Sequence, residues 1–138
     1  MGPKQRFTSL DVSCMTRDVA LRAVGLRLTN IYDLEGSKLY LMKFSIPESE
    51  RAADKGESKV NVLIESGVRF HSTGYDRDKS DMPSAFTMKL RKHLRSKRLE
   101  SVSQLGADRI VDFRFGTGET AFHLIVELYS HGNVVLAS

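Results

Sequence analysis

The chain has 138 residues, of which 41% are hydrophobic, so the composition predicts one domain with a real core over residues 1–138. A single cysteine excludes an internal disulfide framework, and no apolar run reaches the roughly 18 residues that a membrane-spanning helix needs. The N-terminal segment also lacks the apolar stretch of a secretory signal. We therefore expect a cytoplasmic domain without a membrane partner.

The first predicted element is a helix over residues 9–24. Thr8 is a suitable N-cap, and Asp11, three residues later, completes a capping box. Apolar residues recur along this segment at helical spacing: Leu10, Cys14 and Leu21, together with Val12, Met15 and Val19. This spacing predicts a broad face toward the core, with Cys14 as a core residue. Gly25 is placed to end the helix in a left-handed conformation.

Short segments with β-strand patterns follow. The predicted strands cover residues 27–34, 39–46, 59–65, 68–72, 99–105, 110–115, 121–129 and 133–136. Turn signals at 35–37, 66–67, 116–119 and 130–133 join them as hairpins, while the polar stretches 47–58 and 73–82 are predicted loops. Strands joined as hairpins pair antiparallel.

A second helix is predicted over residues 84–97, with Ser84 as its N-cap. Phe86, Leu90 and Leu94 recur at i, i+4 and i+8 and should face the core. The elements together predict an α+β fold, a largely antiparallel β-sandwich with two flanking helices.

Positive charge is concentrated on this second helix. Formal net charge is only +4, but six of the ten residues from Lys89 to Arg98 are Lys or Arg and none is acidic. Five of them are candidate contacts to RNA phosphates: Lys89, Lys92, Arg95, Lys97 and Arg98. The alternative is a solvated face whose cations complement the helix dipole, and the sequence leaves both interpretations open.

Metal and cofactor sites are not expected. The four histidines, at positions 71, 93, 123 and 131, have no metal-ligand spacing with one another or with Cys14. His123 is expected to be a packed or half-exposed strand residue. The GTG at 116–118 lies between two predicted strands, whereas a dinucleotide-binding glycine motif joins a strand to a helix.

Long strings of this sequence resemble the N-terminal domain of the NFACT family. They are RFTSLDV, GLRLTNIYDL, LIESGVRFHST, PSAFTMKLRKHLRSKRL, QLGADRIVDFRFG and HLIVELYSHGNVVLAS. The family includes the eukaryotic nuclear export mediator factor and its fungal counterparts, bacterial RqcH and proteins once labelled fibronectin-binding; the chain is more similar to the eukaryotic form. The resemblance implies a fold similar to the N-terminal domain of formamidopyrimidine-DNA glycosylases.

The resemblance also implies a function in ribosome-associated quality control. Family members bind a large ribosomal subunit that carries peptidyl-tRNA, recruit elongator tRNA and support untemplated C-terminal tailing of the nascent chain. Eukaryotic members help to dock the ubiquitin ligase listerin. These activities also depend on later domains, so we expect this chain to be part of a longer protein.

Three residues match positions that the family links with tRNA engagement and tailing. Asp11 stands in its LDV string, and Asp108 and Arg109 stand in its DR string. Asp11 is also explained as a capping residue, and an adjacent Asp-Arg pair is often just solvated. An arginine can bind phosphate through two parallel hydrogen bonds, with a carboxylate to orient it. We expect the fold to bring the start of the first helix close to the Asp108-Arg109 turn, with the basic helix extending that surface.

Two other functions are disfavoured. A glycosylase-like enzyme would follow from the implied fold, but those enzymes begin with a nucleophilic proline and a catalytic glutamate. Here Met1 and Gly2 precede Pro3, and Lys4 follows it. Fold similarity alone does not carry chemistry, so we predict that the domain is not an enzyme. A surface adhesin is the third alternative, and the missing signal segment argues against it.

Overall fold

The computed structural model describes residues 7–34, 39–47, 59–73, 83–106, 108–128 and 133–138. Its eight strands form two four-stranded antiparallel sheets, each in simple chain order. The first sheet contains β1 (Arg27–Asp33), β2 (Leu39–Ser45), β3 (Lys59–Glu65) and β4 (Arg69–Thr73). The second contains β5 (Leu99–Gln104), β6 (Ile110–Phe115), β7 (Phe122–Glu127) and β8 (Asn133–Ala137). The predicted antiparallel sandwich is thus confirmed, and the strand bounds agree to within one or two described residues.

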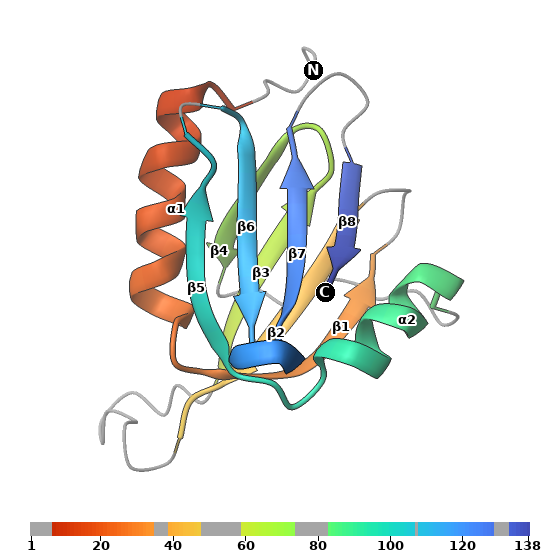
Figure 1. The fold of residues 1–138 in the computed structure, drawn as a ribbon. Helices are drawn as coiled ribbons and strands as arrows, with labels where there is room; N and C mark the ends of the chain where they lie inside the picture. The colour runs from red at the N-terminus through yellow and green to blue at the C-terminus, as the bar shows by residue number, and fades with distance from the viewer. Residues whose placement is uncertain (1–6, 35–38, 48–58, 74–82, 107, 129–132) are drawn as a thin grey trace.

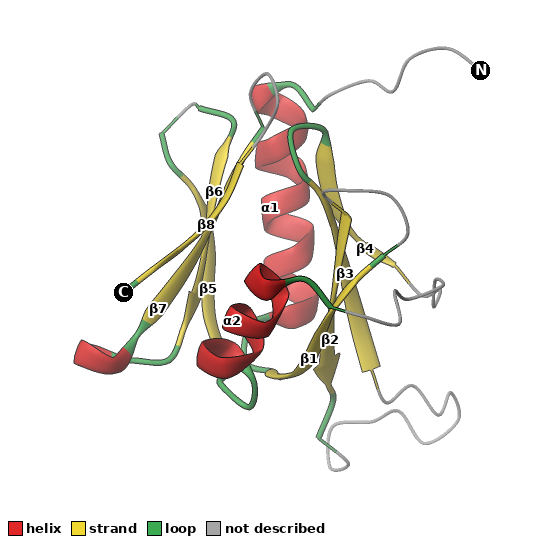
Figure 2. Ribbon diagram, turned by 90° about the vertical axis from the view of Figure 1, so that its right-hand side faces the viewer, coloured by secondary structure: helices red, strands yellow, loops and turns green. Residues whose placement is uncertain are grey.

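The two helices occupy the two open sides between the sheets (Figure 1 and Figure 2). α1 (Ser9–Ala23) packs mainly on β5 and β4, while α2 (Ala85–Leu94) packs on β1. No helix in the described part of the chain is long and apolar enough to cross a membrane. The predicted turns at 35–37 and 130–132 lie outside the described residues. The turn after β6 contains a short 3-10 helix, η2 (Gly118–Thr120), instead of a tight hairpin turn.

Aromatic side chains from both sheets meet in the core. The Phe44 and Phe115 rings are stacked, with centroids 6.3 Å apart and planes 3° from parallel. Phe70 and Phe113 meet edge to face at 5.9 Å. All four side chains are fully buried. Each pair joins one sheet to the other, so these contacts hold the two sheets face to face.

The core face of α1 differs from the predicted one. Its buried residues are Val12, Thr16, Val19 and Ala23. Leu10 and Leu21 are 70% and 82% exposed, and Cys14 is exposed as well. The prediction that Leu10, Cys14 and Leu21 face the core is therefore wrong, because α1 carries apolar residues on two faces and only one of them packs against the sheets.

The second helix is shorter than predicted, since it ends at Leu94. Arg95 is extended, and Ser96 adopts a left-handed conformation with φ of 71°. Hydrogen bonds to β1 account for this early end. The Ser96 N–H donates to the Leu28 carbonyl at 2.7 Å, and the Leu28 N–H donates to the Lys97 carbonyl at 2.9 Å. The backbone after Leu94 is thus drawn into contact with a strand.

Asp33 fixes the other end of α2. Its carboxylate accepts hydrogen bonds from the Ser84 backbone N–H and from the Thr87 hydroxyl. Ser84 is the N-cap, as predicted, and its hydroxyl accepts from the Thr87 N–H at 3.1 Å. Burial, and then the charge of Asp33 across the strand pair, raise the pKa of the Tyr40 phenol. The predicted core face of the helix is confirmed, because Leu90 and Leu94 are buried and Phe86 packs against them.

Candidate nucleic-acid interface

Asp11 caps the first turn of α1, as predicted. Its Oδ2 accepts from the Thr8 N–H at 2.9 Å, while its own N–H donates to the Thr8 hydroxyl at 3.1 Å. These two bonds satisfy backbone donors that have no partner within the helix. The side chain remains exposed, so one carboxylate oxygen serves the cap at a place that solvent reaches.

Asp108 and Arg109 lie in the turn between β5 and β6. The Leu105 N–H donates to the Ile110 carbonyl at 2.9 Å and closes the turn, and the Leu128 N–H donates to the Arg109 carbonyl at 2.8 Å. Asp108 is exposed and Arg109 is half-buried. The Asp108 N–H donates to the Leu105 carbonyl at 3.2 Å, so the backbone of both residues is hydrogen-bonded while their side chains lie at the surface or half-buried.

Gln104 joins this turn to the start of α1. Its Nε2 donates to the Asp108 carbonyl at 2.7 Å and to the Ser9 carbonyl at 3.2 Å. Both elements lie at the same end of the sandwich (Figure 1). The structure thus places the LDV and DR strings next to each other, although about a hundred residues separate them in the chain. Sequence reasoning did not single out Gln104, because nothing in its local pattern distinguishes it from a solvated strand residue.

The predicted cations of the second helix divide into two groups. Lys89 and Lys92 are exposed on α2, and Arg95 follows at the C-cap, where its Nη2 donates to Asn30 Oδ1 at 2.7 Å. Lys97 and Arg98 lie beyond the helix, in the extended segment that leads into β5. Lys97, which the predicted helix over residues 84–97 included, is therefore not helical.

Lys97 and Arg98 instead share a surface cavity with Arg27, at the opposite end of α1 from the Asp108 turn (Figure 1). Gly25, which follows α1, has a φ of +96°, as the sequence predicted, and donates its N–H to the Leu99 carbonyl at 2.8 Å. The fifteen residues of α1 span roughly 22 Å at 1.5 Å per residue. The expectation that the basic segment extends the surface around Asp108 and Arg109 is therefore wrong.

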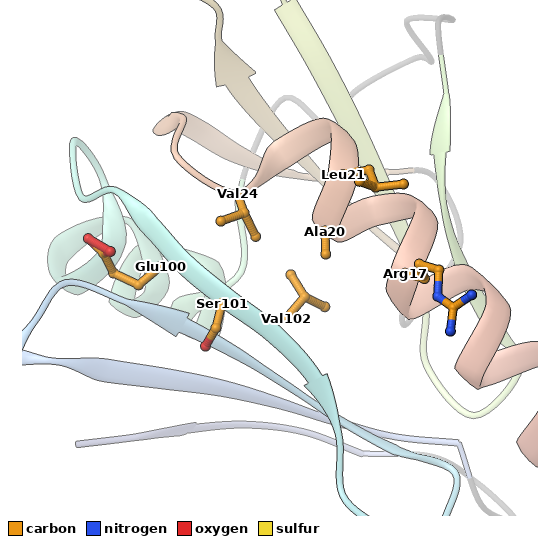
Figure 3. A pocket seen from close by; sticks show the side chains of 7 residues that line it. All are labelled: Arg17, Ala20, Leu21, Val24, Glu100, Ser101 and Val102. Carbon is orange, nitrogen blue, oxygen red and sulfur yellow. The ribbon is translucent and has the colours of Figure 1, made fainter.

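A second depression lies between α1 and β5 (Figure 3). Its volume is about 330 Å³, and Ala20, Val24 and Val102 converge on it, with Arg17 at one side and Glu100 at the other. The lining is mostly apolar and carries no cluster of like charges. Its described lining has one cation, Arg17, and one carboxylate, Glu100, whereas three cations line the cavity near the end of α1.

His123 is half-buried, as expected, and forms a cross-strand pair with Asp112. Its Nδ1 lies 2.9 Å from Asp112 Oδ2 on neighbouring strands β7 and β6. Within the described ranges, no group of three or more His, Cys, Asp or Glu side chains could hold a metal ion. The GTG at 116–118 lies between β6 and β7, where the sequence placed it.

The fold is shared with bacterial domains of known structure. The N-terminal domain of the fibronectin-binding protein PavA from Streptococcus pneumoniae superposes with a TM-score of 0.78 at 21% identity, over 94% of this chain and 51% of that one. The N-terminal part of the fibronectin/fibrinogen-binding protein from Streptococcus suis gives the same TM-score at 24% identity. At these identities the likeness concerns the fold alone.

Sequence comparison is more specific. The chain is 44% identical over 133 residues to "Ribosome quality control complex subunit NEMF" of Homo sapiens, and 39% identical over 134 residues to "Ribosome quality control complex subunit 2" of Saccharomyces cerevisiae. Both alignments cover 96% of this chain but only 11% and 12% of those proteins. Identity to "Rqc2 homolog RqcH" of Bacillus subtilis is 28%, so the closer similarity to eukaryotic members is confirmed. Residues 8–138 match the NFACT N-terminal and middle domains, and the chain belongs to the NFACT family.

Proposed function

We propose that this chain is an RNA-binding module of a cytoplasmic ribosome-associated quality control factor. The complete factor would bind the large ribosomal subunit with its peptidyl-tRNA, recruit elongator tRNA and support untemplated C-terminal tailing of stalled nascent chains. Its partners would be tRNA, ribosomal RNA and, through the rest of the protein, listerin. The names of the eukaryotic relatives, which describe subunits of a ribosome quality control complex, support this proposal.

The contact that Gln104 makes between the start of α1 and the β5–β6 turn carries the proposal. It brings Asp11, Asp108 and Arg109 to one end of the sandwich. We assign these three residues to tRNA engagement. An arginine guanidinium there suits a phosphate, and an exposed carboxylate suits a base amino group or a ribose hydroxyl. Backbone hydrogen bonds hold Asp108 and Arg109 to neighbouring described residues, so the site would be largely preformed.

The other cations would add contacts to RNA phosphates: Lys89, Lys92, Arg95, Lys97 and Arg98. Such contacts position a nucleic acid without reading its sequence, and they weaken as salt rises. Arg91 is used differently, because its Nε donates to the Ile31 carbonyl at 2.8 Å and its guanidinium lies over the Tyr32 ring. It therefore holds α2 against β1, and we do not count it among the candidate contacts to RNA phosphates.

A salt-titrated tRNA-binding assay tests the proposal. The 138-residue chain and a longer form of the protein should both bind, the longer form more tightly, and log K should fall linearly with log salt concentration. Binding that is absent from both forms, or that does not depend on salt, would contradict the proposal. We also propose that the module binds without catalysis, so borohydride treatment with abasic DNA should trap no covalent adduct.

A further inference from the structure

Three cations from two distant parts of the chain line one cavity at the end of α1. Its volume is about 460 Å³, and its described lining residues are Arg27, Ser96, Lys97, Arg98, Glu100, Gly116, Thr117 and Thr120. Three of these side chains are cationic and one is acidic, so the lining has an excess of positive charge. Like charges repel one another, and three of them held this close are stabilised when an anion binds.

Main-chain hydrogen bonds to both sheets hold this segment in place. The Leu28 N–H of β1 donates to the Lys97 carbonyl at 2.9 Å, and the Gly116 N–H, just after β6, donates to the Arg98 carbonyl at 3.0 Å. Arg27 and Arg98 are also paired as an isolated antiparallel bridge. The cations are therefore attached to a fixed backbone, which lowers the ordering cost of binding a ligand between them.

The left-handed Ser96 presents a carbonyl to Arg27. Arg27 Nη1 donates to it at 2.9 Å, which holds the guanidinium beside Ser96, another lining residue of the cavity. On the other side, a Cβ at Gly116 would lie 3.8 Å from Lys97 Nζ, so the ammonium sits close to the backbone that leads into η2. Non-glycine residues rarely adopt the Ser96 conformation, and when they do it is often at a binding site.

The lining also indicates the kind of anion. Ligand cavities of roughly 300 to 1,000 Å³ are usually lined by apolar and aromatic side chains. Here the described lining consists of charged and hydroxyl side chains with one glycine, and it contains no aromatic ring on which a base could stack. Arg98 remains 56% exposed, so an extended ligand can reach it from solvent. These features suit a phosphodiester group better than a base or an apolar molecule.

We infer that this cavity binds a backbone phosphate of RNA between Arg27, Lys97 and Arg98. The inference rests on the proposed RNA-binding function and assigns it a second contact, separate from the Asp108–Arg109 end. Glu100 opposes the ligand, because its Oε1 lies 3.9 Å from Arg98 Nε and competes for that guanidinium. Arg27 is a new member of the interface, and the sequence alone did not connect it with the other two cations.

Amide chemical shifts of the folded chain test the site directly. A uridine hexanucleotide should shift the Thr117 and Thr120 amides in a saturable, salt-dependent manner. Inorganic phosphate at equal charge should shift them far less, and hexaglutamate should not shift them. If RNA leaves both amides unmoved, the inference is wrong. It is equally wrong if free phosphate or the acidic peptide binds as well as RNA, because the cavity would then serve a small anion or an acidic protein segment.

Three variants add a quantitative test with the same RNA. Lys97→Gln combined with Arg98→Gln should lower the salt slope by about 1.4 and weaken binding about 25-fold at 0.1 M salt, the share of two phosphate contacts on a single strand. Arg17→Gln, an exposed cation on α1, is the matched control and should leave the slope unchanged. Glu100→Gln should tighten binding about two- to fivefold. A structural role for Glu100 would produce the opposite sign, and tighter binding cannot arise from partial unfolding.

The outcomes separate this site from the proposed function. Normal tailing by an Arg109→Ala variant of the longer protein would refute the assignment of the Asp108–Arg109 turn to tRNA engagement. That conclusion would hold whether or not RNA shifts the Thr117 amide. Conversely, equal RNA binding by the Lys97–Arg98 double variant and the Arg17 control would refute this site and leave the tailing assignment intact.

Discussion

The two ends of α1 are built in different ways. At the N-terminal end, side chains make the connections: Asp11 and Thr8 cap the helix, and Gln104 joins it to the Asp108 turn. At the other end, backbone hydrogen bonds make the connections. Those around Lys97 join the first sheet, and the bond to Arg98 joins the second sheet. The first end carries two carboxylates and one guanidinium, and the second carries an excess of cations.

This difference separates two properties that the sequence had suggested belong to one surface. A charge-rich turn with fixed geometry suits discrimination between ligands, whereas a cluster of cations suits binding of any phosphate backbone. Roughly 22 Å of helix lies between them. An RNA that contacts both ends must therefore span roughly that distance, and changes at one end should be separable from changes at the other.

The largest effect expected from a single substitution is at the turn. Arg109→Ala should weaken tRNA engagement and tailing by the longer protein by about tenfold or more, because a charge-assisted hydrogen bond would be lost. The free energy of unfolding should change by only about 0.5 kcal/mol, because the half-buried Arg109 side chain is not part of the core. Thermal melts and a tailing assay measure the two effects.

Arg17→Ala, which removes an exposed positive charge from α1, is the control for a change in net charge. It should tail normally. If the Arg109 variant is folded and also tails normally, the turn is not part of the site. If both variants lose activity equally, net charge rather than the turn is responsible.

The next largest effect concerns the capping pair Thr8 and Asp11. Substitutions there distinguish the capping role of Asp11 from its proposed role in tRNA engagement. Asp11→Ala and Thr8→Ala should each cost about 1 kcal/mol of stability, because each removes the same capping box. Only Asp11→Ala should also weaken tRNA engagement. Chemical denaturation and tRNA binding, measured on both variants, decide the matter, and equal binding by the two would leave Asp11 as a cap alone.

At the cationic end, the left-handed Ser96 predicts a change of the opposite sign. Ser96→Gly should stabilise the chain by about 0.5 to 1 kcal/mol, because relief of the left-handed conformation exceeds the extra backbone entropy of glycine. Ser103→Gly is the control, since Ser103 is exposed in the extended strand β5 and should lose about 0.5 to 1 kcal/mol. Denaturation midpoints that fall for both variants would show that Ser96 is not strained.

Local pattern was sufficient for most of the fold. Period-two alternation placed β6, where Val111, Phe113 and Phe115 are all fully buried, and the Thr8–Asp11 spacing marked the start of α1. These signals operate within a few residues, so tertiary contacts had little opportunity to override them. The adjacency of the α1 start and the Asp108 turn was also predicted correctly, but from the family resemblance and not from periodicity.

What the sequence missed depends on contacts between distant segments. The end of α2 is set by hydrogen bonds that the Leu28 backbone exchanges with Ser96 and Lys97, and helical periodicity across 84–97 contains no sign of them. The cationic cavity requires Arg27 to meet Arg98 across 71 positions, which only the sheet topology reveals. The core face of α1 was ambiguous because both of its faces carry apolar residues, and the packing of β4 and β5 selects Val12 and Val19.

The smallest expected effect concerns Cys14, which lies on the exposed face of α1 between the two ends. Cys14→Ser should change the free energy of unfolding by less than about 0.5 kcal/mol, as expected at the surface. A core position would lose more, because a buried hydroxyl needs a partner. The native thiol should also react with a disulfide reagent as fast as it does in denaturant, since no packing protects it.

Because Cys14 is the chain's single cysteine and lies one turn from Asp11, a fluorophore attached there would report on the capped end. Quenching by tRNA that survives the Lys97–Arg98 double substitution but disappears with Arg109→Ala would show that the two ends bind independently. Quenching lost with either change would mean that one RNA must hold both ends at once.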